Sequence, residues 1–378
     1  MGRWETFSPC AGHKEPTQVS AKITPLYELH KELGGNLVDF AGYLMPLRYG
    51  SETAEHHAVR TSAGIFDISH MGEIFVTGAQ AAEALDHALV GLASALEAGR
   101  ARYTMIVNSE GGVLDDLIVY RLSRHGFMVV ANAANAGVVA EELKKRAEGF
   151  EAAVDDQSEN YALIAVQGPR AQAVLERLTD ADLAGLKYYT LISGTVGGVV
   201  SFIARTGYTG EDGFELFIHS EDAVTLWKKI TEAGDGELTP CGLSARDTLR
   251  LEAGMPLYGH ELTADLTPYD AGLGRVVRLE KDFVGRDALA AVAESGPSRR
   301  LVGLVARGRR VPRAGYAVIG DDGSPCGVVT SGAPSPTLGK PIAMAYVGIG
   351  STPVAVDIRG KQEPVDVVDL PFYRRTDK

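Results

Sequence analysis

Two adjacent carboxylates stand near the start of an apolar stretch, GGVLDDLIVY at residues 111–120, which is typical of a glycine turn followed by a β-strand. Successive side chains of a strand point to opposite faces, so we expect Asp116 to share a face with Tyr120 while Asp115 takes the other face. Tyr103, in the upstream segment ARYTMIVN, can reach the Asp116 face across a hairpin. One interpretation is that both aspartates cap the glycine turn by accepting bonds from nearby amides. The other is that a partly buried carboxylate beside an aromatic ring binds a flat, polar heterocycle.

A third carboxylate follows a glycine-rich segment, RTGYTGEDGFELFI at residues 205–218. A dinucleotide fingerprint has different glycine spacing and leads into a helix, whereas this segment leads into a strand and therefore indicates a hairpin connection. In that strand Glu215 faces away from Phe214 and Leu216. An ionised carboxylate accepts two hydrogen bonds side by side, and a pterin ring offers such a pair in its ring N–H and its exocyclic amine. The alternative is a strand-edge glutamate in water.

Two arginines lie four residues apart in the segment CGLSARDTLRLEAGMPLYGHEL, whose middle predicts a helix over 244–253. At this spacing Arg246 and Arg250 share one face of the helix. Either they form an ion-pair network with Asp247 and Glu252, or one of them binds a ligand carboxylate through its planar guanidinium.

The sequence argues against a catalytic triad, a zinc site and a disulfide framework. The segment DISHMG holds an aspartate, a serine and a histidine within four positions, which rarely reach the geometry of a catalytic triad, and no G-x-S-x-G motif is present. The three cysteines, Cys10, Cys241 and Cys326, are too far apart to suggest a zinc site or a disulfide framework. We therefore expect no metal, and a reducing, cytoplasmic location.

The charge balance argues against two classes of partner. The chain has a formal net charge of -12, and an acidic surface repels phosphate backbones and anionic lipids, so we expect neither nucleic acid nor a membrane as a partner. No apolar run approaches the ~18 residues that a membrane-spanning helix needs. The stretch RRLVGLVARGRRVPR is a basic exception. It is either a solvated strand face or a patch that faces an anionic ligand tail or an acidic partner.

The pattern of apolar, charged and turn-forming residues along the chain predicts the helices and strands that must position these side chains. Residues 1–22 read as a flexible extension. Residues 23–280 mix short strands with amphipathic helices in irregular order, which favours an α+β fold with largely antiparallel sheets, divided into two interleaved domains. After the linker-like run ESGPSRR, residues 298–378 are short alternating strands separated by Gly, Asp and Pro, with the hairpin signal DDGS, and predict an all-β, barrel-like domain.

Taken together, these stretches resemble one family, the T-protein of the glycine cleavage system, an aminomethyltransferase. The matching segments are VDFAGYLMPLRYG, RTSAGIFDISHMGEIFVTG, GGVLDDLIVY, VVANAAN, ARTGYTGEDGFEL, SARDTLRLEAGMPLYGHEL and the terminal LPFYRR. They occur in the family's order over nearly the whole chain after the first ~22 residues. The resemblance implies three domains in a cloverleaf around a central folate site, the last domain mostly β.

The resemblance also implies a reaction without a metal. An aminomethyl group carried on the dihydrolipoyl arm of H-protein loses ammonia, and its one-carbon unit passes to tetrahydrofolate to give 5,10-methylenetetrahydrofolate. Asp116 matches the family's key aspartate, and Asp115 is then interpreted as structural, held by the turn. The ligand-binding positions that the resemblance assigns are Tyr103, Tyr120, Asn132, Tyr188 (or its neighbour Tyr189), Glu215, Arg246 and Arg374.

Two alternatives remain beside this interpretation. One is a folate-dependent demethylase of the same fold, acting on a small methylated sulfur or amine compound. The other is a folate-binding module without transferase activity, similar to proteins of this fold linked to iron–sulfur cluster assembly. Those proteins carry a cysteine-containing K-G-C-Y-x-G-Q-E segment where this chain has RTGYTGEDG, so the absence of cysteine argues against that alternative.

Overall fold

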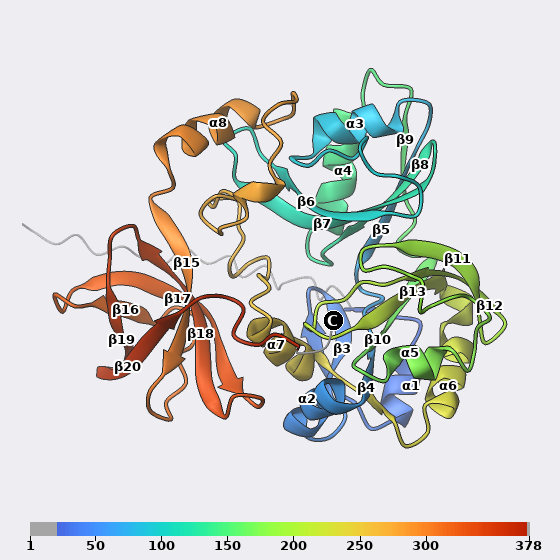
Figure 1. Ribbon diagram of the computed structural model, residues 1–378. Helices are drawn as coiled ribbons and strands as arrows, with labels where there is room; N and C mark the ends of the chain where they lie inside the picture. Colours follow the sequence, from blue (N-terminus) through green and yellow to red (C-terminus); the bar gives the residue numbers. More distant parts are fainter. Residues whose placement is uncertain (1–20, 376–378) are drawn as a thin grey trace, which may run out of the picture.

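The computed structural model describes residues 21–375 as a mixture of helices and four β-sheets, one of which closes into a barrel. Figure 1 shows the barrel on the left, a five-stranded sheet with its helices at the upper right and a six-stranded sheet with its helices at the lower right. In the described part of the chain no helix is long and apolar enough to cross a membrane. The extension expected over residues 1–22 falls almost wholly outside the described residues, although Lys22 already belongs to the first strand.

The six-stranded sheet has the strand order β11-β12-β13-β10-β4-β14, and a three-stranded sheet of order β1-β3-β2 lies beside it. Within residues 21–375 every strand pair is antiparallel except β1 with β3 and β14 with β4, so the expectation of largely antiparallel sheets is confirmed. The strands are β1 (Lys22–Ile23), β2 (Asn36–Phe40), β3 (Tyr43–Arg48), β4 (Ala63–Asp67), β10 (Tyr161–Gln167), β11 (Leu191–Val196), β12 (Val199–Ala204), β13 (Gly213–His219) and β14 (Leu238–Pro240).

The five-stranded sheet has the order β6-β7-β8-β5-β9 and buries both of its faces. One face packs apolar side chains such as Leu117 and Phe127 against the helices that cover it. The other face carries Tyr120 and Met128, which pack with Phe217 of the six-stranded sheet. Its strands are β5 (Gly72–Thr77), β6 (Ala101–Val107), β7 (Val113–Ser123), β8 (Gly126–Ala131) and β9 (Ala153–Asp156). The face of β7 that bears Asp116 is therefore turned toward the second sheet.

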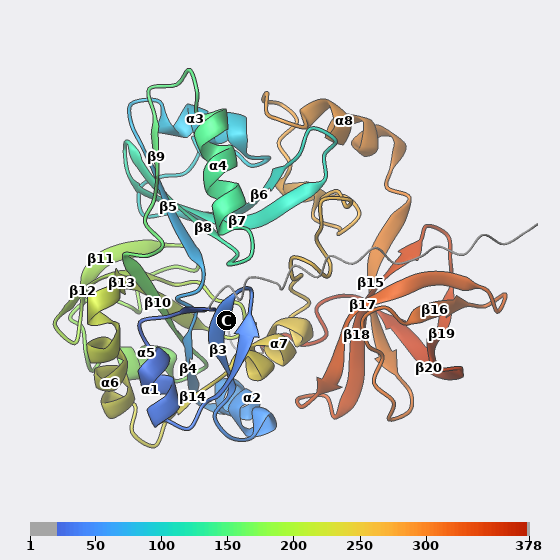
Figure 2. The same ribbon diagram turned by 180° about the vertical axis from the view of Figure 1, so that it is seen from behind.

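Helices α3 and α4 cover the outer face of the five-stranded sheet, and α1, α5 and α6 cover that of the six-stranded sheet. Helix α7 lies between the six-stranded sheet and the barrel with α2 beside it, and α8 lies near the connection from the five-stranded sheet to the barrel (Figures 1 and 2). The helices are α1 (Tyr27–Glu32), α2 (Glu52–Thr61), α3 (Ala81–Ala88), α4 (Ala136–Arg146), α5 (Ala171–Leu175), α6 (Ala223–Ala233), α7 (Leu243–Glu252) and α8 (Arg286–Ser295), with 3-10 turns η1 (Ser220–Asp222) and η2 (Gly274–Val276). The helix predicted over 244–253 is confirmed, and it ends where Gly254 adopts a φ of 64°, a left-handed conformation that glycine takes without steric cost.

The last sheet is a closed barrel of order β15-β18-β17-β16-β19-β20, in which β15 also pairs with β20. The DDGS hairpin signal is confirmed by the antiparallel pair of β16 and β17. The strands are β15 (Arg299–Ala306), β16 (Ala317–Gly320), β17 (Pro325–Ser335), β18 (Lys340–Gly348), β19 (Pro353–Ile358) and β20 (Lys361–Val368). The predicted mixture of helices and antiparallel sheets with a C-terminal β-barrel is thus the observed architecture.

Some arginines of the basic stretch at the start of the barrel lie beside acidic residues of the same chain. Arg307 pairs with Asp366 at 2.7 Å, and Arg310 lies 3.6 Å from Glu363. This pairing favours the interpretation of a solvated strand face over that of a patch reserved for an anionic ligand.

Candidate active site

Asp116 lies in the middle of β7 and is held from both neighbouring strands. The hydroxyl of Tyr103 on β6 donates to Asp116 Oδ2 at 3.1 Å, and Nδ2 of Asn132, just after β8, donates to Oδ1 at 2.9 Å. The carboxyl group is half-buried, and burial raises its pKa to about 6, against the opposing effect of these two hydrogen bonds. A carboxylate that titrates this close to neutrality is suited to accept or return a proton.

Asp115 points to the other face of β7, as the strand alternation predicts, and it is fully buried. It does not cap the glycine turn. The turn's amides are bonded by Asn108, whose Oδ1 accepts from Gly112 N at 2.8 Å, whereas Asp115 accepts from Asn132 and Asn135. The interpretations in which the turn holds one or both aspartates are therefore wrong, because a closer side chain already satisfies the turn.

Glu215 sits on β13 and is buried against the same face of the five-stranded sheet. Its Oε2 accepts from the hydroxyl of Thr206 and, at 3.5 Å, from the hydroxyl of Tyr120, whose ring is also buried. No described residue donates a hydrogen bond to Oε1. Burial raises the pKa of Glu215, while Thr206 and the charge of Arg246 act to lower it. The arrangement excludes a strand-edge glutamate in water and leaves one oxygen open for a ligand.

Arg246 and Arg250 project from neighbouring positions on one side of α7, but their side chains have different partners. Arg250 is buried and bonded to Asp247 at 2.8 Å and to Glu261 at 3.0 Å, so it forms the predicted internal network with one of the two expected partners. Glu252, the other expected partner, bonds elsewhere. Arg246 lies over the ring of Tyr208, 4.8 Å from its centroid, and among residues 21–375 no carboxylate forms an ion pair with it. Of the two arginines, Arg246 is therefore the one available to a ligand.

Two phenols connect the Asp116 side of the site with the Glu215 side. The pKa of Tyr208 is raised by burial, and the negative charge of Asp116 adds to this while the positive charge of Arg246 opposes it. The pKa of Tyr189 is likewise raised by burial and by the charges of both Glu215 and Asp116. Because such effects need close approach, the two carboxylates and the arginine border one region between the sheets.

The C-terminal segment returns from the barrel to this region, but it presents a different arginine from the predicted one. Arg374 is exposed, whereas Arg375 is half-buried and lies 3.5 Å from Asp212. The charge of Arg375 lowers the pKa of Tyr188, which burial raises. Tyr188 and Tyr189 pack edge to face with their centroids 4.8 Å apart, so both predicted alternatives lie here. Adjacent residues of an extended segment point in opposite directions, which is why only one of the two arginines turns inward.

Sequence reasoning missed three side chains of the site. Tyr208 was not singled out, although its place between the glycines of the hairpin connection is a signal that could have identified it. Asn135 was also missed; its spacing of three from Asn132 fits one helical turn. His70 is buried with Nδ1 unpartnered among the described residues, and burial together with the charge of Arg246 lowers its pKa to about 4, so the ring is neutral.

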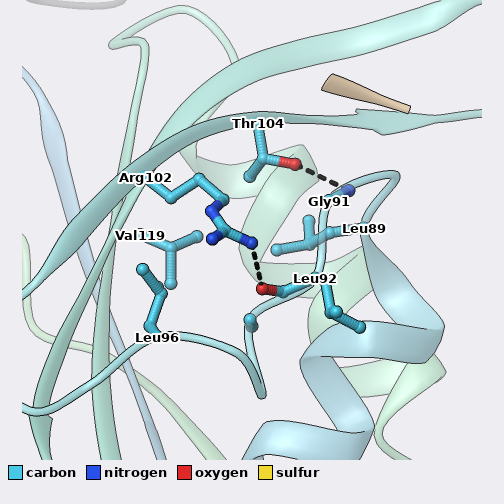
Figure 3. A pocket seen from close by; sticks show the side chains of 8 residues that line it. Leu89, Gly91, Leu92, Leu96, Arg102, Thr104 and Val119 are labelled. Carbon is cyan, nitrogen blue, oxygen red and sulfur yellow. Dashed lines mark hydrogen bonds between the residues drawn. The ribbon is translucent and has the colours of Figure 1, made fainter. Parts of the chain in front are cut away.

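Within residues 21–375 neither the small pocket on the far side of β7 nor any group of metal-binding side chains offers a second candidate site. A shallow pocket with no room for a water-sized ligand lies on the opposite, helix-covered face of β7, lined mainly by apolar side chains including Val119 (Figure 3). Its polar groups are already used, since Arg102 donates to Leu92 O at 2.6 Å and Thr104 accepts from Gly91 N at 2.9 Å. Within residues 21–375 no three His, Cys, Asp or Glu side chains are placed to hold a metal ion.

Comparison with protein families gives two adjoining matches. Residues 26–281 match the family described as "GCVT N-terminal domain", and residues 299–374 match "Glycine cleavage T-protein C-terminal barrel domain". A curated relative named "Aminomethyltransferase", from Streptomyces avermitilis, is 63% identical over 363 residues, which cover 93% of this chain and 97% of that protein. A relative of the same name from Bacillus subtilis is 46% identical over 363 residues, covering 94% and 99%.

A solved structure agrees with these sequence matches. The aminomethyltransferase T of the glycine cleavage system from Bartonella henselae superposes with a TM-score of 0.88 at 41% identity, and the match covers 94% of this chain and 98% of that one. The two family matches, the extent of the relatives and the shared fold lead to one conclusion: the chain belongs to the glycine cleavage T-protein family.

Proposed function

We propose that this chain is a tetrahydrofolate-dependent aminomethyltransferase of the glycine cleavage system, which releases ammonia from the aminomethyl-dihydrolipoyl arm of H-protein and forms 5,10-methylenetetrahydrofolate. In this proposal the five-stranded sheet with its helices, the six-stranded sheet with its helices and the barrel are three domains arranged as a cloverleaf around the site. The observation that carries the proposal is the half-buried Asp116 carboxylate, fixed by Tyr103 and Asn132 on the face that meets Glu215 and Arg246.

The side chains present fit a reduced pterin. Glu215 offers the open Oε1 to the ring N–H and the exocyclic amine, and its Oε2 can accept a second bond in place of the long one from Tyr120. Arg246 and the inward-turned Arg375 supply positive charge for acceptor and carboxylate groups of the ligand. Tetrahydrofolate, when bound, supplies the amine that takes up the one-carbon unit.

Asp116 has two roles in the proposed reaction: it stabilises developing positive charge and it accepts a proton. Positive charge develops between the lipoyl sulfur and the leaving nitrogen during transfer, and a carboxylate held beside it stabilises that charge. With a pKa raised to about 6, the same carboxylate accepts a proton at neutral pH more readily than an ordinary aspartate does. Tyr103 and Asn132 keep it in one orientation, which contributes to the barrier reduction by removing the cost of arranging it during the reaction.

A reconstituted assay tests this function. The purified protein is mixed with aminomethylated, lipoylated H-protein and tetrahydrofolate, and ammonia release and methylenetetrahydrofolate formation are followed together. We expect release that depends on both substrates, and a loss of at least about 100-fold in Asp116→Asn, the scale of an acid–base group. Asp235→Asn, at an exposed position, is the matched control. Ammonia release without tetrahydrofolate at the same rate, or full activity of Asp116→Asn, would contradict the proposal.

A further inference from the structure

The glycine-rich loop between β12 and β13, residues 205–212, is held in place by a buried amide side chain at the end of β10. We infer that this side chain, Gln167, is a positioning residue that fixes the loop and, through the hydroxyl of Thr206, the carboxylate of Glu215. This inference rests on the proposed function in one respect only, the binding of tetrahydrofolate by Glu215.

Gln167 bonds the loop at two points. Its Nε2 donates to the backbone carbonyl of Thr206 at 3.0 Å, and its Oε1 accepts from the hydroxyl of Thr209 at 2.9 Å. All three residues are buried. A buried polar group that loses its partner costs free energy, so the loop cannot leave the amide without leaving a carbonyl, a hydroxyl and the amide itself unpaired.

The glycines of this segment stand where the amide comes closest. A Cβ atom on Gly207 would lie 2.0 Å from Oε1 of Gln167, and the next two nearest atoms also belong to that side chain. A Cβ atom on Gly213, the cross-strand neighbour of Gln167, would lie 2.5 Å from Nε2. Both distances are too short for a real carbon contact. Two glycines of the predicted hairpin connection therefore make room for Gln167.

The loop held in this way brings two side chains to the ligand-binding groups. The hydroxyl of Thr206 donates to Oε2 of Glu215. The ring of Tyr208 supports the guanidinium of Arg246, whose central carbon lies 4.8 Å from the ring centroid. Gln167 bonds the backbone carbonyl of the same threonine whose hydroxyl holds Glu215, so a shift of that carbonyl moves the hydroxyl as well.

Loss of the bond from Thr206 changes both the orientation and the proton affinity of Glu215. Burial raises the pKa of Glu215 and the bond from Thr206 lowers it, so without this bond the carboxyl takes up its proton at higher pH. The other charged or titratable groups that face Glu215 are Tyr120 from β7, Arg246 from α7, and Tyr188 and Tyr189 from the segment before β11. Burial raises the pKa of each of these phenols, which are therefore neutral near pH 7.

The test compares Gln167→Met with Val174→Ala in the full-length protein. Methionine has nearly the size of glutamine but makes neither hydrogen bond, whereas Val174 on α5 lies in the apolar core of the six-stranded sheet and its truncation lowers stability through lost packing. Protein labelled with ¹³C at the glutamate carboxyl carbons is titrated by NMR without ligand, and the Glu215 signal is assigned by its loss in Glu215→Gln. We expect the midpoint of Glu215 to rise in Gln167→Met and to keep its wild-type value in Val174→Ala.

Calorimetric titration with tetrahydrofolate follows on the same variants. We expect Kd to rise about tenfold in Gln167→Met, the scale of one hydrogen bond to a charged group, and to stay unchanged in Val174→Ala. A raised midpoint with weaker binding supports both the inference and the ligand role of Glu215. A raised midpoint with unchanged binding in Gln167→Met and in Glu215→Gln supports the inference and overturns that ligand role.

Three results overturn the inference itself. The first is an unchanged Glu215 midpoint in Gln167→Met, whatever its affinity. The second is an equal shift of the midpoint in Val174→Ala. The third is unchanged tetrahydrofolate binding in Gln167→Met when Glu215→Gln weakens it.

Thr209 offers a milder pair of variants if Gln167→Met does not fold. Thr209→Val removes one of the two bonds of the amide and keeps the size of the side chain, whereas Thr209→Ser keeps the hydroxyl. We expect the Glu215 midpoint and Kd to rise in Thr209→Val and to return toward the wild-type values in Thr209→Ser. Equal midpoints in the two variants would show that the amide does not hold the loop, and the inference would fail.

The close approach at Gly207 gives an independent check. The methyl group of Gly207→Ala meets the amide of Gln167 in the wild type but finds room in Gln167→Ala. We expect Gly207→Ala alone to weaken tetrahydrofolate binding, and the double variant to bind no more weakly than Gln167→Ala. Losses that multiply in the double variant would contradict the inference, because the two residues would then act separately.

Discussion

Replacing Glu215 by glutamine tests the ligand-binding half of the site most sharply, because the two oxygens of this carboxylate have different environments. Oε2 is occupied by Thr206 and Tyr120, and Oε1 has no partner among the described residues. In the variant the amide oxygen can stand in the place of Oε2 and keep the hydroxyl donors Thr206 and Tyr120. The amide nitrogen then takes the open position and points its hydrogens at the N–H groups of the pterin edge.

The size of the effect follows from that geometry. A hydrogen bond to a charged group contributes about 1.5–3 kcal/mol, and Glu215→Gln replaces one such bond by two donors that face each other. We therefore expect the dissociation constant for tetrahydrofolate to rise roughly 10- to 150-fold, at about 1.4 kcal/mol for each factor of ten. Glu215→Ala gives a loss of similar size, since it removes the bond without adding the opposed donors.

Isothermal titration calorimetry measures the affinity, and Glu221→Gln, exposed just beyond the end of β13, is the matched control. Because burial raises the pKa of Glu215, the wild-type affinity falls as the pH drops through that raised pKa, whereas the glutamine variant has no such dependence. A folded Glu215→Gln protein that binds tetrahydrofolate as tightly as the wild type would refute the assignment of the pterin edge to this residue.

Three further predictions concern the remaining charged groups. Asp116→Ala lowers turnover at least about 100-fold with an unchanged thermal unfolding midpoint, whereas equal turnover of Asp116→Ala and wild type would contradict the proposed chemistry. Arg246→Met weakens tetrahydrofolate binding by roughly tenfold without loss of stability, while Arg250→Met lowers the free energy of urea unfolding by about 3–5 kcal/mol because it leaves Glu261 buried and unpaired. Burial raises the pKa of Glu252, but hydrogen bonds and charge outweigh it and lower the pKa to about 2. Glu252 therefore stabilises the fold by roughly 3 kcal/mol above its unfolded pKa of 4.5 and loses this as the pH falls toward 2, so urea unfolding of Glu252→Gln should vary less between pH 5 and pH 2 than that of the wild type.

The part of the site that the sequence predicts well is the part governed by local periodicity. Alternation along a strand separates Asp115 from Asp116, and it places Tyr103 on the Asp116 face once β6 and β7 pair as a hairpin. Helical spacing likewise predicts that Arg246 and Arg250 leave α7 in similar directions. These relations need only the secondary structure, which the apolar pattern and the glycines indicate.

The sequence predicts poorly whatever depends on partners distant in the chain. The partner of Asp115 is the segment after β8, and that contact requires the order β6-β7-β8 in the sheet. Which arginine of α7 stays free is decided by Glu261 and by Ser331 of the barrel, which bonds Arg250 at 2.8 Å. The terminal arginines stand in an extended segment without apolar periodicity, so no local pattern separates Arg375 from Arg374.

The barrel contributes to the site by holding α7 rather than by supplying a reacting group. Glu252 at the end of this helix accepts from Thr337 at 2.8 Å and pairs with Arg60 of α2 at 2.9 Å, so one carboxylate ties the barrel to the six-stranded body. Two residues earlier, Arg250 bonds Ser331. With its last turn fixed on the barrel side, α7 has little freedom to rotate, and Arg246 is kept over Tyr208. The segment over residues 26–281 thus contains Asp116, Glu215 and Arg246, yet the position of the arginine depends on the second matched segment, over residues 299–374.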